Sequence, residues 1–211
     1  MRRRRKHGAG ARAKAYDQAY FDRWYRDPRR RIATPADITR KARLVVGVAE
    51  SLLQRPVRSA LDIGCGEGAW RRVLQGIRPG LRYVGVDSSA YVVSRFGASR
   101  GIRYGTFGTL ATADLAGPFD LVICCDMLQY VEAAELSRGL ASVAGLLGGV
   151  AYLEAYTTSD EVVGDRRGWH HRAPAWYRRA FGRAGLVGVG MHCWVGDALR
   201  DATAALERSG R

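Results

Sequence analysis

The chain has 211 residues, 47% of them hydrophobic, and a formal net charge of +14. This length and apolar content suffice for one α/β domain with its own core and do not require a second domain. The longest apolar run, residues 140–153, is short and contains two adjacent glycines, so no membrane-spanning segment is expected. The four cysteines show no metal-ligand spacing, and we expect a cytoplasmic protein with reduced thiols and no bound metal.

The positive charge is concentrated at the start of the chain. Residues 1–31 contain twelve Arg or Lys and three Asp, which leaves a charge of +5 for the other 180 residues. Residues 1–14 are therefore expected to form a basic flexible arm, and Arg12 and Lys14 fall where a secretion signal would need apolar residues. For residues 2–6, a solvated tail and an arm that binds nucleic acid or another acidic surface both remain open.

Aromatic residues after the arm are spaced to lie on one face of a short helix. The spacing i, i+4, i+5, i+8, i+9 brings them to one side, and Asp27-Pro28 ends the helix. A second helix is expected from a Thr34 N-cap to about residue 53, with Asp37 completing a capping box. Residues 15–54 are therefore expected to form an N-terminal helical extension. The aromatic residues are Tyr16, Tyr20, Phe21, Trp24 and Tyr25.

From residue 59 onward, short apolar runs that end in Gly or Asp alternate with amphipathic stretches of helical length. This pattern is typical of repeated βα units. Residues 55–211 are therefore expected to form one α/β domain, a three-layer, doubly wound, mostly parallel sheet with helices on both faces. Strands are expected at 59–63, 82–86, 102–104, 119–124, 149–155 and 186–194. Helices are expected near 68–76, 89–96, 132–146, 174–184 and 197–208.

A glycine-rich loop follows the first expected strand. Residues 64–69 read Gly-Cys-Gly-Glu-Gly-Ala, and such glycines let the backbone turn tightly and approach a ligand closely. They also satisfy the dinucleotide fingerprint, with Asp87 at a suitable distance to hold a ribose, so a nicotinamide enzyme fits the glycines equally well. Asp62 separates the two alternatives, because a carboxylate beside the loop repels an anionic pyrophosphate and attracts a cofactor that carries an ammonium group.

Residues 61–68 resemble the first motif of class I S-adenosylmethionine-dependent methyltransferases, a hydrophobic residue followed by Asp/Glu-x-Gly-x-Gly-x-Gly. The resemblance extends over about residues 59–195 and implies the class I methyltransferase fold, a Rossmann-like sheet of six or seven strands. It implies S-adenosylmethionine as the cofactor, with Asp62 near its amino group and Asp87 accepting both ribose hydroxyls. The other residues that it implies at this part of the cofactor are Gly64, Cys65, Gly66, Gly68 and Ser88.

Two later turns supply the remaining cofactor candidates. By the same resemblance, Thr106 and Phe107 fall where adenine is contacted, although the acid or amide usual in the family is absent there, and a plain loop fits this segment as well. Cys125, Asp126 and Met127 follow the fourth expected strand and should border the cofactor. The alternative for Asp126 is that it caps the next helix.

The loop after the fifth expected strand holds the candidates for acceptor chemistry. His170 and His171 are the candidate bases, because histidine titrates near neutrality. Trp169 and Tyr156 are expected to wall the acceptor site. Adjacent histidines in an arginine-rich loop are also often solvated, so a base is one of two open interpretations. Methyl transfer from a sulfonium needs alignment and exclusion of water first, and a strong catalytic residue is not obligatory.

The resemblance also suggests a role for the N-terminal aromatic face. In many small-molecule members of the family an aromatic helix folds over the cofactor cleft, and Tyr20, Trp24 and Tyr25 would form such a lid, unless they pack against the helices of the sheet. The leading hypothesis is methyl transfer to O, N or C of a small-molecule acceptor. Two alternatives remain open: an RNA or protein methyltransferase anchored by residues 2–6, and a non-catalytic interaction protein with the cofactor fold.

Overall fold

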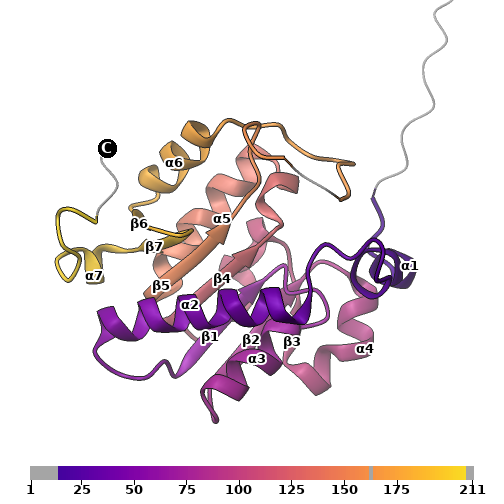
Figure 1. Ribbon diagram of the computed structural model, residues 1–211, viewed down its shortest axis with the longest axis horizontal. Coiled ribbons are helices and arrows are strands. Elements are labelled where there is room, and N and C mark those ends of the chain that lie inside the picture. Colours follow the sequence, from indigo (N-terminus) through magenta and orange to yellow (C-terminus); the bar gives the residue numbers. More distant parts are fainter. Residues whose placement is uncertain (1–13, 162–163, 208–211) are drawn as a thin grey trace, which may run out of the picture.

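The computed structural model describes residues 14–161 and 164–207, so the expected basic arm lies outside the described residues except for Lys14. The described chain forms a seven-stranded sheet with helices on both sides (Figure 1). Within the described ranges no helix is long and apolar enough to cross a bilayer. No group of three or more His, Cys, Asp or Glu in those ranges could hold a metal ion.

The strand order is β3-β2-β1-β4-β5-β7-β6, so the chain turns back across the sheet between β1 and β4. β1 pairs in parallel with β2 on one side and with β4 on the other. β7 runs antiparallel to both of its neighbours. The expectation of a doubly wound, mostly parallel sheet is therefore confirmed. The strands are β1 (Ser59–Ile63), β2 (Arg82–Asp87), β3 (Ile102–Tyr104), β4 (Phe119–Cys125), β5 (Leu147–Glu154), β6 (Val187–Gly190) and β7 (Cys193–Val195).

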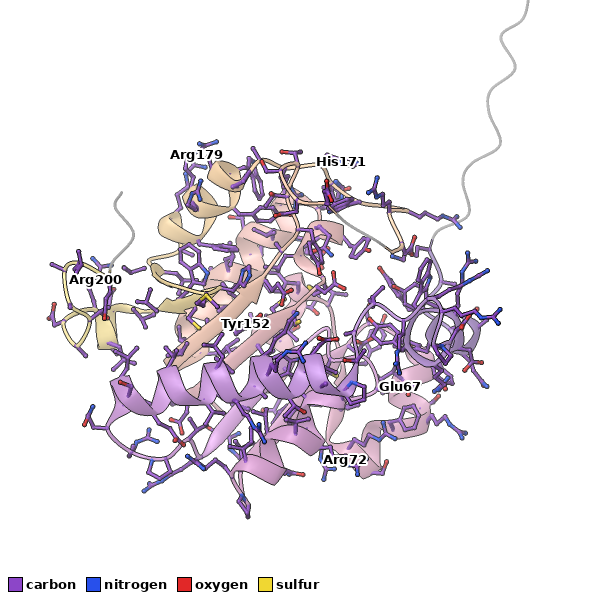
Figure 2. All side chains as sticks on the ribbon, viewed as in Figure 1. Glu67, Arg72, Tyr152, His171, Arg179 and Arg200 are labelled. Atoms are coloured by element: carbon purple, nitrogen blue, oxygen red, sulfur yellow. The ribbon has the colours of Figure 1, made fainter. Side chains whose placement is uncertain are left out.

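Helices cover the two faces of the sheet and close two apolar cores. On one face, α2 (Pro35–Leu53) and α3 (Ala69–Ile77) pack over buried residues that include Tyr152 of β5 (Figure 2). On the other face, α5 (Ala133–Leu146), α6 (Pro174–Arg183) and the 3-10 turn η2 (Phe107–Thr112) cover the second core. α4 (Ala90–Arg100) connects β2 to β3.

The N-terminal extension has the two expected parts. Thr34 and Asp37 form the predicted capping box, with Thr34 N–H donating to the Asp37 carboxylate at 2.8 Å and Asp37 N–H to the Thr34 hydroxyl at 3.2 Å. α2 ends at Leu53, as expected. The aromatic segment is a helix of one turn, α1 (Gln18–Phe21), followed by the π-helical turn η1 (Asp22–Arg26). The single short helix predicted there is thus divided.

The C-terminal region differs from the prediction in two places. The expected strand at 186–194 is the hairpin β6–β7, and this division supplies the seventh strand. Met191 and His192, with φ of 50° and 62°, form its two-residue turn, and positive φ at both central residues matches the twist of a hairpin. The helix expected at 197–208 is only α7 (Asp197–Arg200). Its N-cap is Gly196, which has no side chain to satisfy the first amide groups.

Candidate active site

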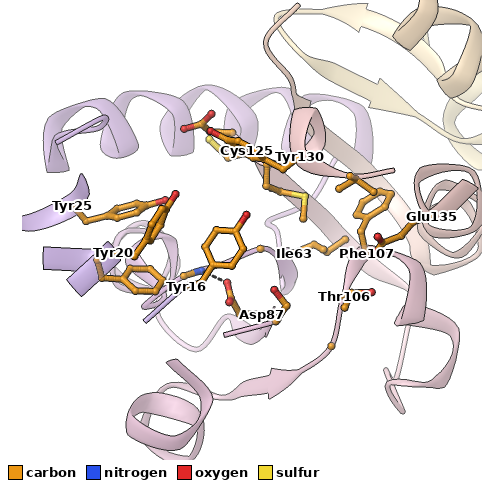
Figure 3. Close-up of a pocket in the computed structure, with 18 residues that line it drawn as sticks. Tyr16, Tyr20, Tyr25, Ile63, Asp87, Thr106, Phe107, Cys125, Tyr130 and Glu135 are labelled. Atoms are coloured by element: carbon orange, nitrogen blue, oxygen red, sulfur yellow. Dashed lines mark hydrogen bonds between the residues drawn. The ribbon is translucent and has the colours of Figure 1, made fainter. Parts of the chain in front are cut away.

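A cavity of about 220 Å³ lies at the carboxyl ends of β1, β2 and β4 (Figure 3). The strand order reverses there, and open α/β sheets bind ligands at such a point. The cavity wall brings together residues predicted from four separate segments, and the N-terminal aromatic segment completes it. The lining residues among the cofactor candidates are Gly64, Gly66, Asp87, Ser88, Thr106, Phe107, Cys125, Asp126 and Met127.

The loop after β1 approaches its surroundings too closely for side chains. Gly64 has a φ of 68°, and a Cβ atom there would lie 2.8 Å from Met127 Cγ. Gly66 has a φ of 52°, and its Cβ would lie 3.2 Å from the ring of Phe21. Both positions therefore favour glycine through backbone conformation and through space. The bare backbone of this loop faces the cavity.

Asp87 closes β2 with a carboxylate that also shapes the glycine loop. Its Oδ2 accepts from Gly66 N–H and its Oδ1 from Ser89 N–H, each at 2.8 Å. Burial nevertheless raises the pKa of Asp87, against the effect of these backbone bonds. A carboxylate has about four acceptor positions, so Asp87 retains capacity for ligand hydroxyls in the cavity.

Three predicted cofactor residues do not line the cavity. Asp62 is buried beneath the loop, where Tyr83 donates its hydroxyl to it at 2.7 Å, and burial raises the Asp62 pKa to about 7. Cys65 packs in a small core with Phe21. Gly68 is the N-cap residue of α3. The structure thus places the Asp62 carboxyl beneath the loop and not in the cavity wall, and its expected position near the cofactor's amino group stays a prediction.

Asp126 lies at the junction of the main cavity and a smaller adjoining cavity. Gln129 donates its side-chain amide to the Asp126 carboxylate at 2.6 Å. Burial raises the pKa of Asp126 to about 6, which places its titration close to neutrality. The sequence also allowed Asp126 to cap the next helix. In the structure its carboxylate accepts from a side chain, and the N-cap residue of α5 is Glu132, so Asp126 does not cap that helix.

Lys41 and Glu154 form a partly buried ion pair next to Cys125. Lys41 Nζ lies 2.7 and 2.6 Å from the two carboxylate oxygens of Glu154 at the end of β5. The same carboxylate accepts from the hydroxyl of Tyr152 at 2.8 Å and from the thiol of Cys125 at 3.2 Å. The Lys41 ammonium and these bonds hold the pKa of Glu154 below its usual value, although burial acts the other way. The cluster fixes the end of β5 beside the cavity.

The aromatic segment is fastened over the cavity by contacts to the cofactor loops. Arg26 forms an ion pair with Glu67, the residue between the second and third glycines, and donates to the hydroxyl of Tyr91 at 3.3 Å. Ser89 donates its hydroxyl to the backbone carbonyl of Tyr16. These contacts hold the segment over the cavity, and the ring contact of Phe21 with Tyr91 also packs it against α4, so the lid and the helix-packed layer both describe its position.

The lid residues predicted from sequence divide between the two cavities. Tyr20 and Tyr25 line both of them. Trp24 lines only the adjoining cavity, together with the predicted acceptor-site residue Tyr156. Figure 3 shows Tyr20 and Tyr25 beside Tyr16 in the main cavity wall.

The two histidines and Trp169 are not among the lining residues of either cavity, so the structure does not bring them together with the cofactor candidates. His170 N–H donates to the Gln129 carbonyl at 2.8 Å, and its Nε2 lies 3.5 Å from Glu132. His171 packs on the ring of Trp169, with centroids 4.9 Å apart. These backbone and ring contacts hold the loop beside α5.

Several lining residues were not predicted as site residues. Tyr16 and Phe21 belong to the aromatic stripe and could have been found by extending the lid prediction to its whole face. Tyr130 follows the turn after β4, and Glu135 enters from α5, a helix that the motif does not include. The lining residues in this group are Tyr16, Phe21, Ile63, Gly105, Tyr130, Val131 and Glu135.

Residues 26–187 match the family model of a methyltransferase domain. The match covers most of the chain, and the chain therefore belongs to the S-adenosylmethionine-dependent methyltransferases, which use S-adenosylmethionine as cofactor. An uncharacterized protein of Synechococcus sp. is 30% identical over 105 residues, 46% of this chain and 25% of that protein. The chain thus spans about a quarter of the length of this curated relative.

Solved methyltransferases share the fold. One from Archaeoglobus fulgidus has a TM-score of 0.60 at 14% identity, over 80% of this chain and 73% of that one. The amino pentose methyltransferase CalS10 of Micromonospora echinaspora, bound to S-adenosylmethionine, has a TM-score of 0.56 at 19% identity. This match covers 73% of this chain and 87% of CalS10. Magnesium protoporphyrin IX methyltransferase of Synechocystis PCC 6803, with bound S-adenosylhomocysteine, has a TM-score of 0.54 at 20% identity. This match covers 82% of this chain and 87% of that enzyme. At these identities the likeness shows the fold alone.

Proposed function

We propose that this chain transfers a methyl group from S-adenosylmethionine to O, N or C of a small molecule. The observation that carries the proposal is the covered cavity: the aromatic segment walls the site at the strand ends, where a macromolecular acceptor would need open access. Its volume of about 220 Å³ is below the roughly 300–1,000 Å³ usual for ligand pockets, so the segment would have to move when ligands enter. Two of the solved relatives are named for small-molecule acceptors.

The residues of the cavity fit the cofactor. The bare loop at Gly64 and Gly66 would take the methionine part, and Asp87 would accept the ribose hydroxyls. Phe107 and Thr106 would lie beside adenine. S-adenosylmethionine would supply a methyl group on a sulfonium: an electron pair of the acceptor would bond to the methyl carbon, and the sulfur would leave with the pair of the broken bond as a neutral thioether. The protein then has to align the acceptor and exclude water.

Calorimetric titration with S-adenosylmethionine tests the cofactor half of the proposal. The wild type should bind, and Asp87→Ala should lose at least about tenfold in affinity, because a bidentate acceptor of two hydroxyls is removed. Asp201→Ala, at an exposed position of the C-terminal turns, is the matched control. Because Asp87 also holds two backbone amides, unfolding temperatures of all variants must accompany the titration. Absence of binding by the folded wild type would overturn the proposal.

A screen of metabolite and RNA pools for methyl acceptance tests the acceptor half. Turnover with a low-molecular-weight fraction supports the proposal. Turnover confined to RNA, and lost when residues 2–13 are deleted, would replace it with an RNA methyltransferase whose basic arm anchors the substrate. The salt dependence of such binding would be steep, since phosphate contacts release counterions.

A further inference from the structure

The ammonium group of Lys14 lies among tyrosine rings at the edge of the active site. Its Nζ is 3.7 Å from the ring centroid of Tyr130, 5.0 Å from that of Tyr16 and 5.2 Å from that of Tyr20. The same nitrogen is 2.8 Å from Asp165 Oδ2, and the Lys14 side chain is only 12% exposed. We call these three rings and the Asp165 carboxylate the tyrosine box.

Such a box has the chemistry of an ammonium receptor. The faces of aromatic rings carry negative potential, and proteins use cages of them to recognise alkylammonium ligands. A surface lysine normally keeps its charged end in water, because drawing it inward sacrifices hydration and side-chain freedom. The Lys14 side chain is thus an alkylammonium group whose charge lies against Asp165 and three ring faces.

The box is continuous with the space where an acceptor would react. Tyr16, Tyr20 and Tyr130 all line the main cavity, and Figure 3 labels them among its wall residues. Tyr20, Tyr130 and Asp165 also line the adjoining cavity, in which Asp126 forms the shared wall. The box therefore shares wall residues with both cavities that Asp126 lines.

The charge of the cavity wall selects the same class of ligand. Asp87, Asp126 and Glu135 are lining residues, whereas the described lining residues include neither Lys nor Arg. The sulfonium of the cofactor accounts for part of this negative wall. Asp165 adds a further carboxylate on the side of the adjoining cavity, with Lys14 as its cation. An anionic acceptor would be repelled here and a cationic one attracted.

We propose that the tyrosine box is the binding site for the methyl acceptor, that this acceptor is a primary or secondary amine bound as its ammonium ion, and that Lys14 occupies the box until the acceptor displaces it. The reaction part rests on the proposed function. An ammonium ion has no free lone pair, so it must lose one proton before transfer, and Asp126 is the carboxylate placed to take it. Burial raises the pKa of Asp126 and makes it a stronger base than an exposed aspartate.

The test measures binding of n-butylammonium and of its neutral counterpart n-butanol by saturation-transfer NMR, without cofactor. Lys14→Met empties the box of its internal cation while keeping an unbranched side chain. The variant should bind n-butylammonium about tenfold more tightly than the wild type, as expected when a competing occupant is removed, with no gain for n-butanol. Arg95→Met, at a cation that lies over a single ring on α4, is the matched control and should change neither affinity.

A second substitution separates the ring from the hydroxyl. Tyr130 donates its hydroxyl to the Asp165 carbonyl, so a phenylalanine removes this bond but keeps the ring. In the Lys14→Met background, Tyr130→Phe should retain the gain and Tyr130→Leu should abolish it. If Lys14→Met shows no gain, or an equal gain for n-butanol, the box is only a fastening of the chain and the inference fails. Calorimetry with S-adenosylmethionine on the same proteins distinguishes that result from failure of the methyltransferase function.

Discussion

The substitution Lys41→Met should measure how much the Lys41 ammonium group contributes to the stability of the fold at the end of β5. The Glu154 side chain is 8% exposed and would be left without its charged partner. Breaking a fully buried ion pair costs roughly 3–5 kcal/mol, and because the Lys41 side chain is 30% exposed we expect a loss of about 2–4 kcal/mol in the free energy of unfolding at neutral pH. The hydrogen bonds from Tyr152 and Cys125 remain in the variant.

The loss of stability in Lys41→Met should depend on pH, because it depends on the ionisation of Glu154. In the wild type the pKa of Glu154 is lowered, so the pair contributes stability above the unfolded value of about 4.3 and loses it as pH falls through the folded pKa. In the variant the unpaired carboxyl can protonate. The difference in unfolding free energy between the two proteins should therefore be largest near pH 7 and shrink below about pH 4.

Urea denaturation at several pH values measures this difference. Lys41→Met with Glu154→Gln removes both charges and should recover part of the loss at pH 7, because no buried charge is then left alone. Arg40→Met is the matched control on the same helix, since its ion pair with Asp37 is exposed and should contribute much less. A loss at pH 7 no greater than that of Arg40→Met, or one that does not change with pH, would refute the reasoning.

Three further substitutions test the cofactor loop and the lid. Gly64→Ala should lower affinity for S-adenosylmethionine at least about tenfold and destabilise the fold by about 1–2 kcal/mol, since φ is 68° and Met127 Cγ is 2.8 Å from the added Cβ. Asp62→Asn should gain stability relative to the wild type as pH rises from about 4 to about 7, because the raised Asp62 pKa makes ionisation of the wild-type carboxyl unfavourable. Arg26→Met should speed release of S-adenosylmethionine severalfold in stopped-flow experiments, with less than about 1 kcal/mol change in stability, since its ion pair to Glu67 is partly exposed.

Each of these has a control with the same chemical change. Gly76→Ala in α3 meets nothing within 4 Å and should leave binding unchanged. Asp201→Asn is exposed and should show no relative gain with pH. Arg29→Met is exposed and should not alter release. Equal effects in a control and its partner would contradict the structural explanation for that site.

The fold was largely predictable because its signals are local. Buried parallel strands give short apolar runs, and the Thr34 capping box marks the start of α2 within four residues. The hairpin β6–β7 gave no such signal, because Met191 and His192 occupy a turn that usually takes Asn or Gly. Without a turn signal, the apolar and glycine residues of 186–194 predict one continuous strand.

The site was predictable where it lies directly at strand ends. The direction of Asp62 was not, since side chains of a strand alternate between faces, and Asp62 points away from the cavity that its neighbour Ile63 lines. His170 and His171 were placed by sequence proximity to a strand end, whereas hydrogen bonds to distant backbone direct their loop elsewhere. The contact of Lys14 with the ring of Tyr130 arises only through tertiary packing, which sequence spacing does not reveal.

The contact between Phe21 and Gly66 links access to the site with the conformation of its cofactor loop. The aromatic segment rests on the bare backbone of that loop, and Ser89, two residues after Asp87 at the end of β2, donates its hydroxyl to the backbone of Tyr16 in the segment. Swinging the segment outward would therefore uncover cofactor and acceptor positions in one movement. Exchange of spent cofactor and of methylated product would then share a single gate, and its opening rate, rather than the chemistry of transfer, would set the upper limit on turnover.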